Sequence, residues 1–367
     1  MNAHADALED TRGCPFRDMS RFDQPKNARF RLTGMAKRPV PRRLSHALIS
    51  TLIVALVVPL LSQQPAAWKD PSSHASQFIP VGQDVRLEVL DWGGAGRPLV
   101  LLAGGGDTAH VFDDFAPRLT SDFHVYGITR RGFGESGFAP LTSGSDTFGD
   151  DVLAVLDALK LESPVLVGHS IGGQELSSIG TRYPNRVAAL VYFDAAYPYA
   201  FDNGKVPTFK EISAVGFPQP PPPTEADLAT FDGLRQYYIR VLGFTYPEGE
   251  LRQKRSATPE GRVGPMRPFP GGRVLTAGMK QYVQIRTPAL FLVSSQSPGR
   301  WAETSTDPMI REQIAGLSAF TERQAKAIED GLPSARVVRL PGANHYVFLS
   351  NEDDVLREMR AFLGRLG

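Results

Sequence analysis

Short runs of consecutive apolar residues recur along this chain from about residue 78 onward. They lie at 99–103, 123–128, 165–167, 188–193, 289–293 and 337–340. Because a strand that is apolar at consecutive positions must be covered on both faces, these runs predict a parallel sheet between layers of helices. Helix-period stripes lie between some of the runs: Val152, Leu156 and Leu159, and later Val355, Met359 and Phe362. The alternation predicts an α/β fold with a mostly parallel sheet flanked by helices.

One block interrupts the alternation. Residues 197–280 have no clear strand and contain the proline-rich run PQPPPP, which is typical of a stiff connector. Thr224, with Asp227 three residues later, predicts the start of a helix. The partial apolar stripe of that helix is Leu228, Phe231, Tyr238 and Val241. We therefore expect 197–280 to form a helical cap, or lid, inserted between two parts of a core domain, 78–196 and 281–367.

The first 67 residues differ from the rest of the chain. Four basic residues between 37 and 43 precede a mostly apolar stretch of 15 residues at 47–61. This order is typical of a secretory signal, and the stretch is shorter than the roughly 20 residues of a membrane-spanning helix. No good cleavage sequence follows, which leaves an uncleaved membrane anchor as the alternative. We expect 1–67 to comprise a disordered start and a signal peptide or anchor, and the protein to be exported to the periplasm or outside the cell.

Composition excludes several classes of function. The formal net charge is +1, so no strong field attracts nucleic acid, and we expect no nucleic-acid partner. Cys14 is the only cysteine, which excludes an internal disulfide and a cysteine-based metal cluster. GFGESG at 132–137 fits a dinucleotide-binding pattern, but FAP follows it where a helix should begin. We expect no cofactor and no metal, and the sequence does not determine the oligomeric state.

The pentapeptide Gly168-His169-Ser170-Ile171-Gly172 follows one of the apolar runs and precedes a helix-compatible segment. In a nucleophile elbow, a serine lies on a strained turn between strand and helix, where larger neighbours would collide with the surrounding backbone. Such a turn presents the hydroxyl at the carboxyl edge of the sheet. We interpret Ser170 as a nucleophile in preference to a residue of a structural glycine turn.

With this motif, the chain resembles the α/β-hydrolase superfamily over roughly residues 78–365. LLAGGGD at 101–107 resembles the family's oxyanion loop, and TRRGFGES at 129–136 resembles the loop after the fourth strand. PGANHYVF at 341–348 resembles the loop that carries the catalytic histidine. Ala103 and Thr129 depart from the usual histidine and aspartate of these loops. The resemblance implies a serine hydrolase with an inserted helical cap.

A serine hydroxyl needs a base that is neutral near pH 7, and histidine provides one. His345, which lies late in the chain after a predicted strand, is the expected base. His124 and His169 are interpreted as structural, although His169, beside the elbow, is also a candidate for the pocket wall. His110 and Tyr197 are further candidates for lining the pocket.

Asp194 ends the apolar run that follows the elbow. From Ser170 the chain would descend a helix and return by one strand to the same edge, and neighbouring strands lie about 4.8 Å apart. Asp194 is therefore the expected acid, with Asp307 and Glu303 as alternatives. Backbone N–H groups of Ile171 and Gly105 are expected to form the oxyanion hole, with Gly106 in reserve.

These residues predict a serine hydrolase that cleaves small carboxylic esters or lactones through an acyl-enzyme. The cap offers aromatic residues that either form the pocket wall or pack the cap itself: Phe231, Tyr237, Tyr238 and Phe244. Hydrolysis of a carbon–carbon bond or an amide, and cofactor-free haloperoxidase activity, are alternatives within this fold. A receptor or scaffold without turnover is an alternative from a different class.

Overall fold

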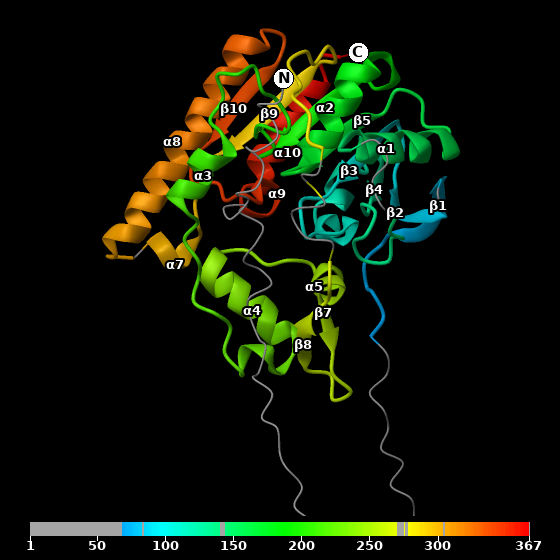
Figure 1. Ribbon diagram of the computed structural model, residues 1–367. Coiled ribbons are helices and arrows are strands. Elements are labelled where there is room, and N and C mark those ends of the chain that lie inside the picture. Colours follow the sequence, from blue (N-terminus) through cyan, green and yellow to red (C-terminus); the bar gives the residue numbers. More distant parts are fainter. Residues whose placement is uncertain are drawn as a thin grey trace, which may run out of the picture. The chain divides into compact units, whose positions relative to one another are not determined.

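The predicted apolar runs form strands of one sheet in a computed structural model that describes residues 68–366 except 83, 140–143, 270–274, 276, 277 and 304. Within these residues, eight strands pair in the order β1-β2-β4-β3-β5-β6-β9-β10 (Figure 1). Their bounds are β1 Ala75–Gly82, β2 Val85–Gly93, β3 Arg97–Leu102, β4 Phe123–Ile128, β5 Val165–His169, β6 Ala189–Phe193, β9 Ala289–Ser294 and β10 Arg336–Leu340. β2 is antiparallel to both of its neighbours, and the other neighbouring pairs are parallel. The predicted, mostly parallel sheet is confirmed.

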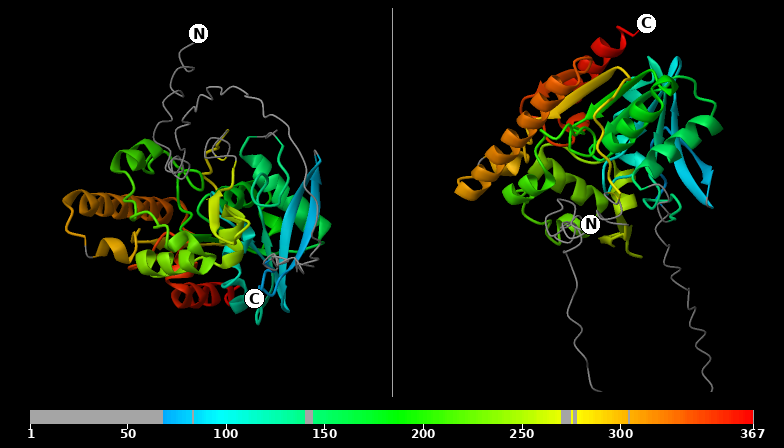
Figure 2. Two further views of the ribbon diagram at one scale, coloured as in Figure 1. Left: turned by 90° about the horizontal axis from the view of Figure 1, so that it is seen from below. Right: turned by 45° about the horizontal axis from the view of Figure 1, so that its top comes forward.

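Helices cover both faces because the central strands are apolar on both. In β3, Val100 and Leu102 pack into one hydrophobic core, whereas Leu99 and Leu101 pack into the other. The first core is closed by the helices α1 Asp146–Ala158, α2 Gly172–Arg182 and α8 Pro308–Gly331 (Figures 1 and 2). The second core is closed by α10 Glu352–Leu363 and the short 3-10 helices η2 Ala109–Phe112 and η3 Ala116–Leu119. The remaining short helices of the core are η4 Pro184–Arg186, α7 Arg300–Glu303 and α9 Val347–Ser350.

The block between β6 and β9 contains most of what was expected of a cap, together with one unexpected element. Among its described residues are the helices α3 Phe209–Val215, η5 Asp227–Ala229, α4 Phe231–Leu242 and α5 Glu248–Lys254. The expectation of no strand was wrong, because β7 Arg255–Ala257 and β8 Val263–Met266 pair as a two-stranded antiparallel sheet. α3 packs against α8, whereas α4, α5, β7 and β8 lie together (Figure 1). The role of 197–280 as a lid stays a prediction.

The helix predicted to begin at Thr224 begins instead at Phe231. Thr224 and Asp227 do form reciprocal capping bonds, in which Thr224 N donates to Asp227 Oδ2 at 2.9 Å and Asp227 N donates to Thr224 Oγ1 at 3.2 Å. This turn ends after η5, because Thr230 adopts an extended backbone and provides a second cap, accepting from Gly233 N at 2.9 Å. Two successive threonine caps therefore divide one predicted helix into η5 and α4.

The amino-terminal predictions for 1–67 concern residues outside those described. Among the described residues, no helix is long and apolar enough to cross a membrane. β1 begins at Ala75, so the predicted core range 78–196 starts inside this strand. Asp70–Gly367 belong to one compact unit, which carries the site described below.

A largely buried lysine joins α5 to the loop that follows β3. Lys254 Nζ forms an ion pair with Asp107 Oδ1 and lies 3.6 Å from Glu250 Oε1. Glu250 is fully buried and accepts a hydrogen bond from Thr108 N at 3.2 Å. Burial raises the pKa of Glu250 to about 8; the Lys254 ammonium opposes this rise and the Asp107 carboxylate adds to it. One cation thus lies between two buried carboxyl groups, and losing it would leave buried charge uncompensated.

This arrangement predicts that the contribution of Glu250 to the free energy of unfolding falls as the pH rises from about 5 to 8. The carboxyl of Glu250 ionises near its ordinary pKa of 4.5 in the unfolded chain but only near pH 8 when folded, so the unfolded state binds fewer protons over this range. Glu250→Gln cannot ionise and keeps an acceptor for Thr108. Relative to the parent protein, the variant should gain stability toward pH 8, by up to about 1.4 kcal/mol per unit of pKa difference.

Urea unfolding of both proteins at pH 5 and pH 8 measures this difference. Glu248→Gln is the matched control on the same helix, because Glu248 pairs with Arg252 at a partly exposed position. Parallel pH profiles for the parent protein and Glu250→Gln would contradict the prediction.

Candidate active site

Ser170 lies in the turn between β5 and α2, in a left-handed backbone conformation with φ 50°. The glycines beside it have a steric explanation. A Cβ on Gly168 would lie 2.8 Å from the carbonyl of Gly172, and a Cβ on Gly172 would lie 2.9 Å from the Leu102 oxygen. Neither position tolerates a side chain without movement of the backbone, which is the constraint expected of a nucleophile elbow. Strain at a non-glycine residue of this kind concentrates at functional sites.

His345 and Asp194 meet as the sequence predicts. His345 Nδ1 lies 2.6 Å from Asp194 Oδ2. Asp194 directly follows β6 and is itself left-handed, with φ 41°. Its carboxylate also accepts hydrogen bonds from Ser294 N at 2.8 Å and from Gln296 Nε2 at 2.6 Å. These donors fix the carboxylate, and the carboxylate in turn fixes the orientation of the imidazole.

The alternative acids lie elsewhere. Glu303 and Asp307 are both exposed. Asp307 caps α8 by accepting a hydrogen bond from Met309 N at 2.9 Å. The structure therefore brings Asp194 to the imidazole of His345, and neither alternative acid.

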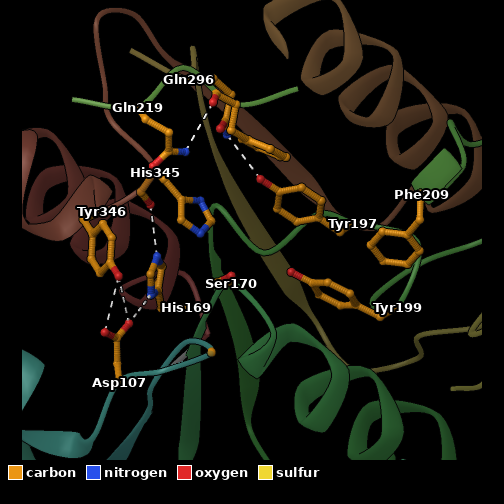
Figure 3. A pocket seen from close by; sticks show the side chains of 12 residues that line it. Asp107, His169, Ser170, Tyr197, Tyr199, Phe209, Gln219, Gln296, His345 and Tyr346 are labelled. Atoms are coloured by element: carbon orange, nitrogen blue, oxygen red, sulfur yellow. Dashed lines mark hydrogen bonds and ion pairs between the residues drawn. The ribbon is translucent and has the colours of Figure 1, made fainter. Parts of the chain in front are cut away.

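Ser170 and His345 line the same cavity, which has a volume of about 220 Å³. Figure 3 shows the imidazole and the hydroxyl turned toward this common space. Tyr199 lines the cavity beside Ser170; burial raises the pKa of its phenol well above the usual range, and the neighbouring Ser170 hydroxyl offsets this in part. No hydrogen bond between Ser170 and His345 occurs among those of the described residues. In enzymes without bound substrate this contact is often long and tightens only in the complex.

Two further candidates line this cavity as expected, Tyr197 and His169. The Tyr197 hydroxyl accepts from Gln296 Nε2 at 3.4 Å. His169 is fully buried, and burial lowers its pKa well below its usual range. Because its Nε2 lies 3.1 Å from the His345 carbonyl oxygen, the neutral ring carries its proton there and donates it. His169 thus supports the backbone of His345 while forming part of the wall.

The wall of the cavity comes largely from residues that the sequence did not single out. Its further aromatic members are Tyr199, Phe209, Phe217 and Tyr346, and its amides are Gln219 and Gln296 (Figure 3). The predicted aromatic residues of α4 and its flank follow the alternative interpretation and pack the cap. The ring centroids of Tyr238 and Tyr246 are 4.9 Å apart, and those of Phe244 and Tyr246 are 6.0 Å apart. The reason is that the segment containing α3, rather than α4, passes beside the elbow.

His110 was expected to line the pocket and does not. It lies in η2, where Nδ1 is 3.2 Å from Asp113 Oδ2 and Nε2 is 3.5 Å from Glu88 Oε1. Burial lowers its pKa, but the nearby carboxylates of Asp113 and Glu88 outweigh burial and raise the pKa to about 10. These carboxylates hold the imidazole away from the cavity.

The loop after β3 is fixed beside the elbow by a residue that sequence analysis did not identify. Arg130 donates to the carbonyls of Ala103 and Gly104, at 2.9 and 3.2 Å, and its Nε lies 2.6 Å from Glu175 Oε1. Gly105, the predicted oxyanion donor, lines the cavity. Ile171 stands at the amino-terminal end of α2, and Gly106 is left-handed with φ 84°. The loop and helix end thus flank Ser170, and their roles as donors stay predictions.

Comparison with known proteins identifies the family. The model of the alpha/beta hydrolase family matches residues 99–358, which is more than half of the chain. Pimeloyl-[acyl-carrier protein] methyl ester esterase of Pectobacterium atrosepticum is 25% identical over 75% of this chain and 99% of its own length. Several relatives match over less than half of their own length, among them the bifunctional esterase/perhydrolase of Acinetobacter calcoaceticus, 33% identical over 33% of this chain and 45% of its own.

Solved structures agree on the fold. The crystal structure of E-2-(acetamidomethylene)succinate hydrolase superimposes with a TM-score of 0.55 at 19% identity, covering 79% of this chain and 99% of the other. At this identity the likeness concerns the fold alone. Together with the matched residues 99–358, it leads to one conclusion: this chain belongs to the α/β hydrolase family.

Proposed function

We propose that this hydrolase cleaves small, uncharged carboxylic esters or lactones through an acyl-enzyme formed on Ser170. The observation that carries the proposal is the 2.6 Å contact between His345 Nδ1 and Asp194 Oδ2 beside the strained elbow serine. This contact leaves Nε2 of the same ring free to act on the hydroxyl. The esterase names of two relatives support the ester class.

In the proposed reaction, Ser170 Oγ attacks the acyl carbon while His345 Nε2 accepts the hydroxyl proton. Asp194 keeps the imidazole in the required tautomer and stabilises its cation. The N–H groups of Ile171 and Gly105 donate to the oxyanion of the tetrahedral intermediate. His345 then gives the proton to the departing alkoxide. Water repeats the sequence on the acyl-enzyme and releases the acid.

The cavity favours small and neutral substrates. Its volume of about 220 Å³ lies below the roughly 300–1,000 Å³ of common ligand pockets. Its walls are mainly aromatic, and no lysine or arginine lines it among the described residues. Among the described residues, the one carboxylate that lines it, Asp107, is engaged by Lys254 and accepts from the Tyr346 hydroxyl at 3.1 Å. A charged substrate group would therefore find no free counter-ion there.

Substitution of the proposed triad should abolish turnover without unfolding the protein. Ser170→Ala is expected to lose covalent labelling by a fluorophosphonate probe, and it should lower kcat/KM for p-nitrophenyl butyrate by about 10³-fold or more. Asp194→Asn should cause a loss of similar size, because the imidazole loses its orienting acceptor. Asp307→Asn and Glu303→Gln are the matched controls and should retain activity.

Labelling and ester kinetics of these variants separate the alternatives. Loss of activity in Asp307→Asn, but not in Asp194→Asn, would overturn the assignment of the acid. A folded wild-type protein that does not label would favour a receptor or scaffold. If the protein labels and turns over amides or diketones but not esters, the substrate is not an ester, and one of the alternative hydrolase activities applies.

The size of the cavity should appear as a preference for short acyl chains. We expect kcat/KM for p-nitrophenyl butyrate to exceed that for the laurate by at least tenfold, because a twelve-carbon chain does not fit about 220 Å³. Phe217→Ala removes a ring from the wall and enlarges the cavity, so it should lower the ratio of kcat/KM for the butyrate to that for the laurate. Phe138→Ala, at an exposed position outside the wall, is the control. A ratio near one in the parent protein would contradict the proposed cavity.

We also propose export, on the basis of the basic and apolar order of 37–61. Mass spectrometry of protein recovered outside the cytoplasm is expected to show a mature chain that begins near Trp68. An intact chain in the membrane fraction would instead support the anchor.

A further inference from the structure

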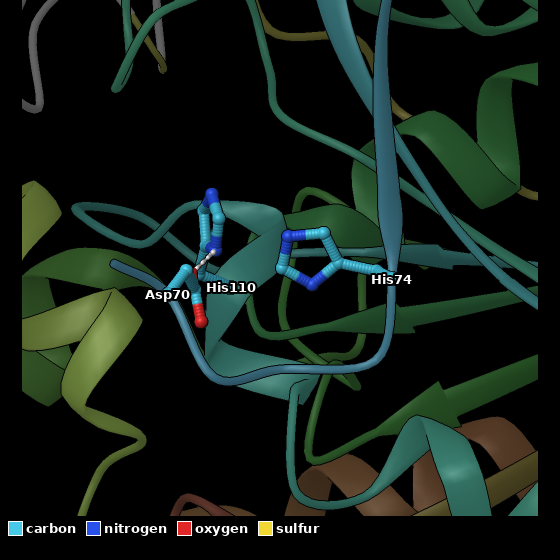
Figure 4. Close-up of side chains that lie close together, drawn as sticks. All are labelled: Asp70, His74 and His110. Carbon is cyan, nitrogen blue, oxygen red and sulfur yellow. Dashed lines mark ion pairs between the residues drawn. The ribbon is translucent and has the colours of Figure 1, made fainter.

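A second group of ionisable side chains lies apart from the cavity, where the segment before β1 passes η2 (Figure 4). Asp70 and His74 belong to that segment, His110 belongs to η2, and Asp113 directly follows η2. The side chains of His74, His110 and Asp113 are 6%, 7% and 1% exposed. Asp70 is 24% exposed, which gives the group a route to solvent.

Three donor atoms of this group converge under α5. His110 Nδ1 lies 3.4 Å from Asp70 Oδ2 and 3.2 Å from Asp113 Oδ2. A Cβ on Gly249 would lie 2.9 Å from each of these oxygens and 3.3 Å from the nitrogen. Ligands bound at about 2.1 Å around a tetrahedral ion are separated by about 3.4 Å. The donors are therefore spaced as metal ligands are, and glycine at 249 adds no side chain where they meet.

In each of the two imidazoles, the ring nitrogen that would not bind a metal lies near a carboxylate, as is usual for metal-binding histidines. His74 Nδ1 lies 2.8 Å from Asp113 Oδ1, so it can donate its proton there and leave Nε2 for a ligand. His110 Nε2 is buried without a hydrogen bond, 3.5 Å from Glu88 Oε1. With Nδ1 on a metal, His110 would carry its proton on Nε2 and donate it to Glu88. Carboxylate acceptors for the second ring nitrogen are usual around metal-bound histidine.

The negative charges around this group also favour a bound cation. Asp70, Asp113 and Glu88 bring three carboxylates to a largely buried place, which requires positive charge nearby. Ligand atoms of Asp70, His74 and His110 all lie within 4.8 Å of one another. Imidazole nitrogen with carboxylate oxygen is a donor set that Zn²⁺ accepts readily.

We propose that Asp70, His74, His110 and Asp113 bind one divalent transition-metal ion, of which Zn²⁺ is the best match. The ion would tie the segment that precedes β1 to η2. Because His110 does not line the catalytic cavity, the ion would act on stability and not on the ester chemistry. The proposal is therefore independent of the proposed function.

The test is metal binding by chelator-treated, full-length protein. Titration with Co²⁺ should produce the visible absorption of a low-symmetry site with one equivalent bound, and Zn²⁺ should displace it. Thermal unfolding should shift upward with added Zn²⁺, since an ion that binds only the folded state stabilises it. Asp70→Asn, at a partly exposed position, removes one ligand. Gly249→Ala keeps every ligand and places a methyl group among the donors. Both should weaken binding by at least tenfold.

His124→Gln is the matched control, because the surface pair of His124 and Asp91, 2.8 Å apart, offers only two donors. It should bind one equivalent with unchanged affinity. Absence of binding to the parent protein would overturn the proposal and indicate that protons on the two histidines balance the carboxylates. Unchanged binding by folded Asp70→Asn would also overturn it, and this variant decides the question even where Gly249→Ala does not fold.

Discussion

The site depends on the parallel register of four neighbouring strands. β5, β6, β9 and β10 lie side by side in that order, and their carboxyl ends meet at one edge of the sheet. Ser170 follows β5, Asp194 follows β6 and His345 follows β10. The sheet therefore brings residues up to 175 positions apart in the sequence to the same edge. Because each strand end is fixed by its neighbours, the sheet sets where Ser170 and Asp194 lie, and the contact with Asp194 fixes His345 in the loop after β10.

The same register sustains the strained backbone at the site. Ser170 and Asp194 both have left-handed φ angles and carry side chains there. Each is tied to the next strand by a backbone hydrogen bond, from Ser170 N to Phe193 O at 3.1 Å and from Asp194 N to Leu292 O at 2.8 Å. Strained residues persist only where the surroundings over-determine them. These two hydrogen bonds continue the pairing of the strands past their ends, and they supply that constraint.

Features that depend on a short stretch of sequence could be predicted, whereas features that depend on contacts between distant residues could not. Six strands, β3 to β6, β9 and β10, were predictable because burial leaves uninterrupted apolar runs, whereas the largely exposed β1 lacks one. Ser170 was predictable because its steric constraint requires two nearby glycines. Where two possible helix caps lie close together, the sequence did not show which one begins the helix. Thr224 has a cap partner in Asp227, yet Thr230 begins the longer helix. β7 and β8 are short and only partly buried, and therefore lack an apolar run.

Partners that depend on the fold were least predictable. Gln296 orients Asp194 from a loop 102 residues away, and Tyr199 lines the cavity of Ser170 from the start of the block between β6 and β9. No local pattern marks either residue, because glutamine and tyrosine are common in ordinary loops. His110 shows the opposite error. Its place after the oxyanion loop indicated the cavity, but the carboxylates of Glu88, which lies in β2, and of Asp113, three residues after His110, draw it away.

α5 links these observations, although it is only seven residues long. Its Lys254 and Glu250 hold Asp107 and Thr108, immediately after the loop that contains Gly105. One residue before Glu250, Gly249 lies over the donors from Asp70, Asp113 and His110. A single short helix therefore fixes the stretch from Asp107 to Asp113 at both ends, through buried charge at one end and close backbone approach at the other. An oxyanion donor is effective only when it does not have to reorganise. In the proposed reaction, the position of Gly105 would therefore depend on the packing of α5 as much as on the sheet.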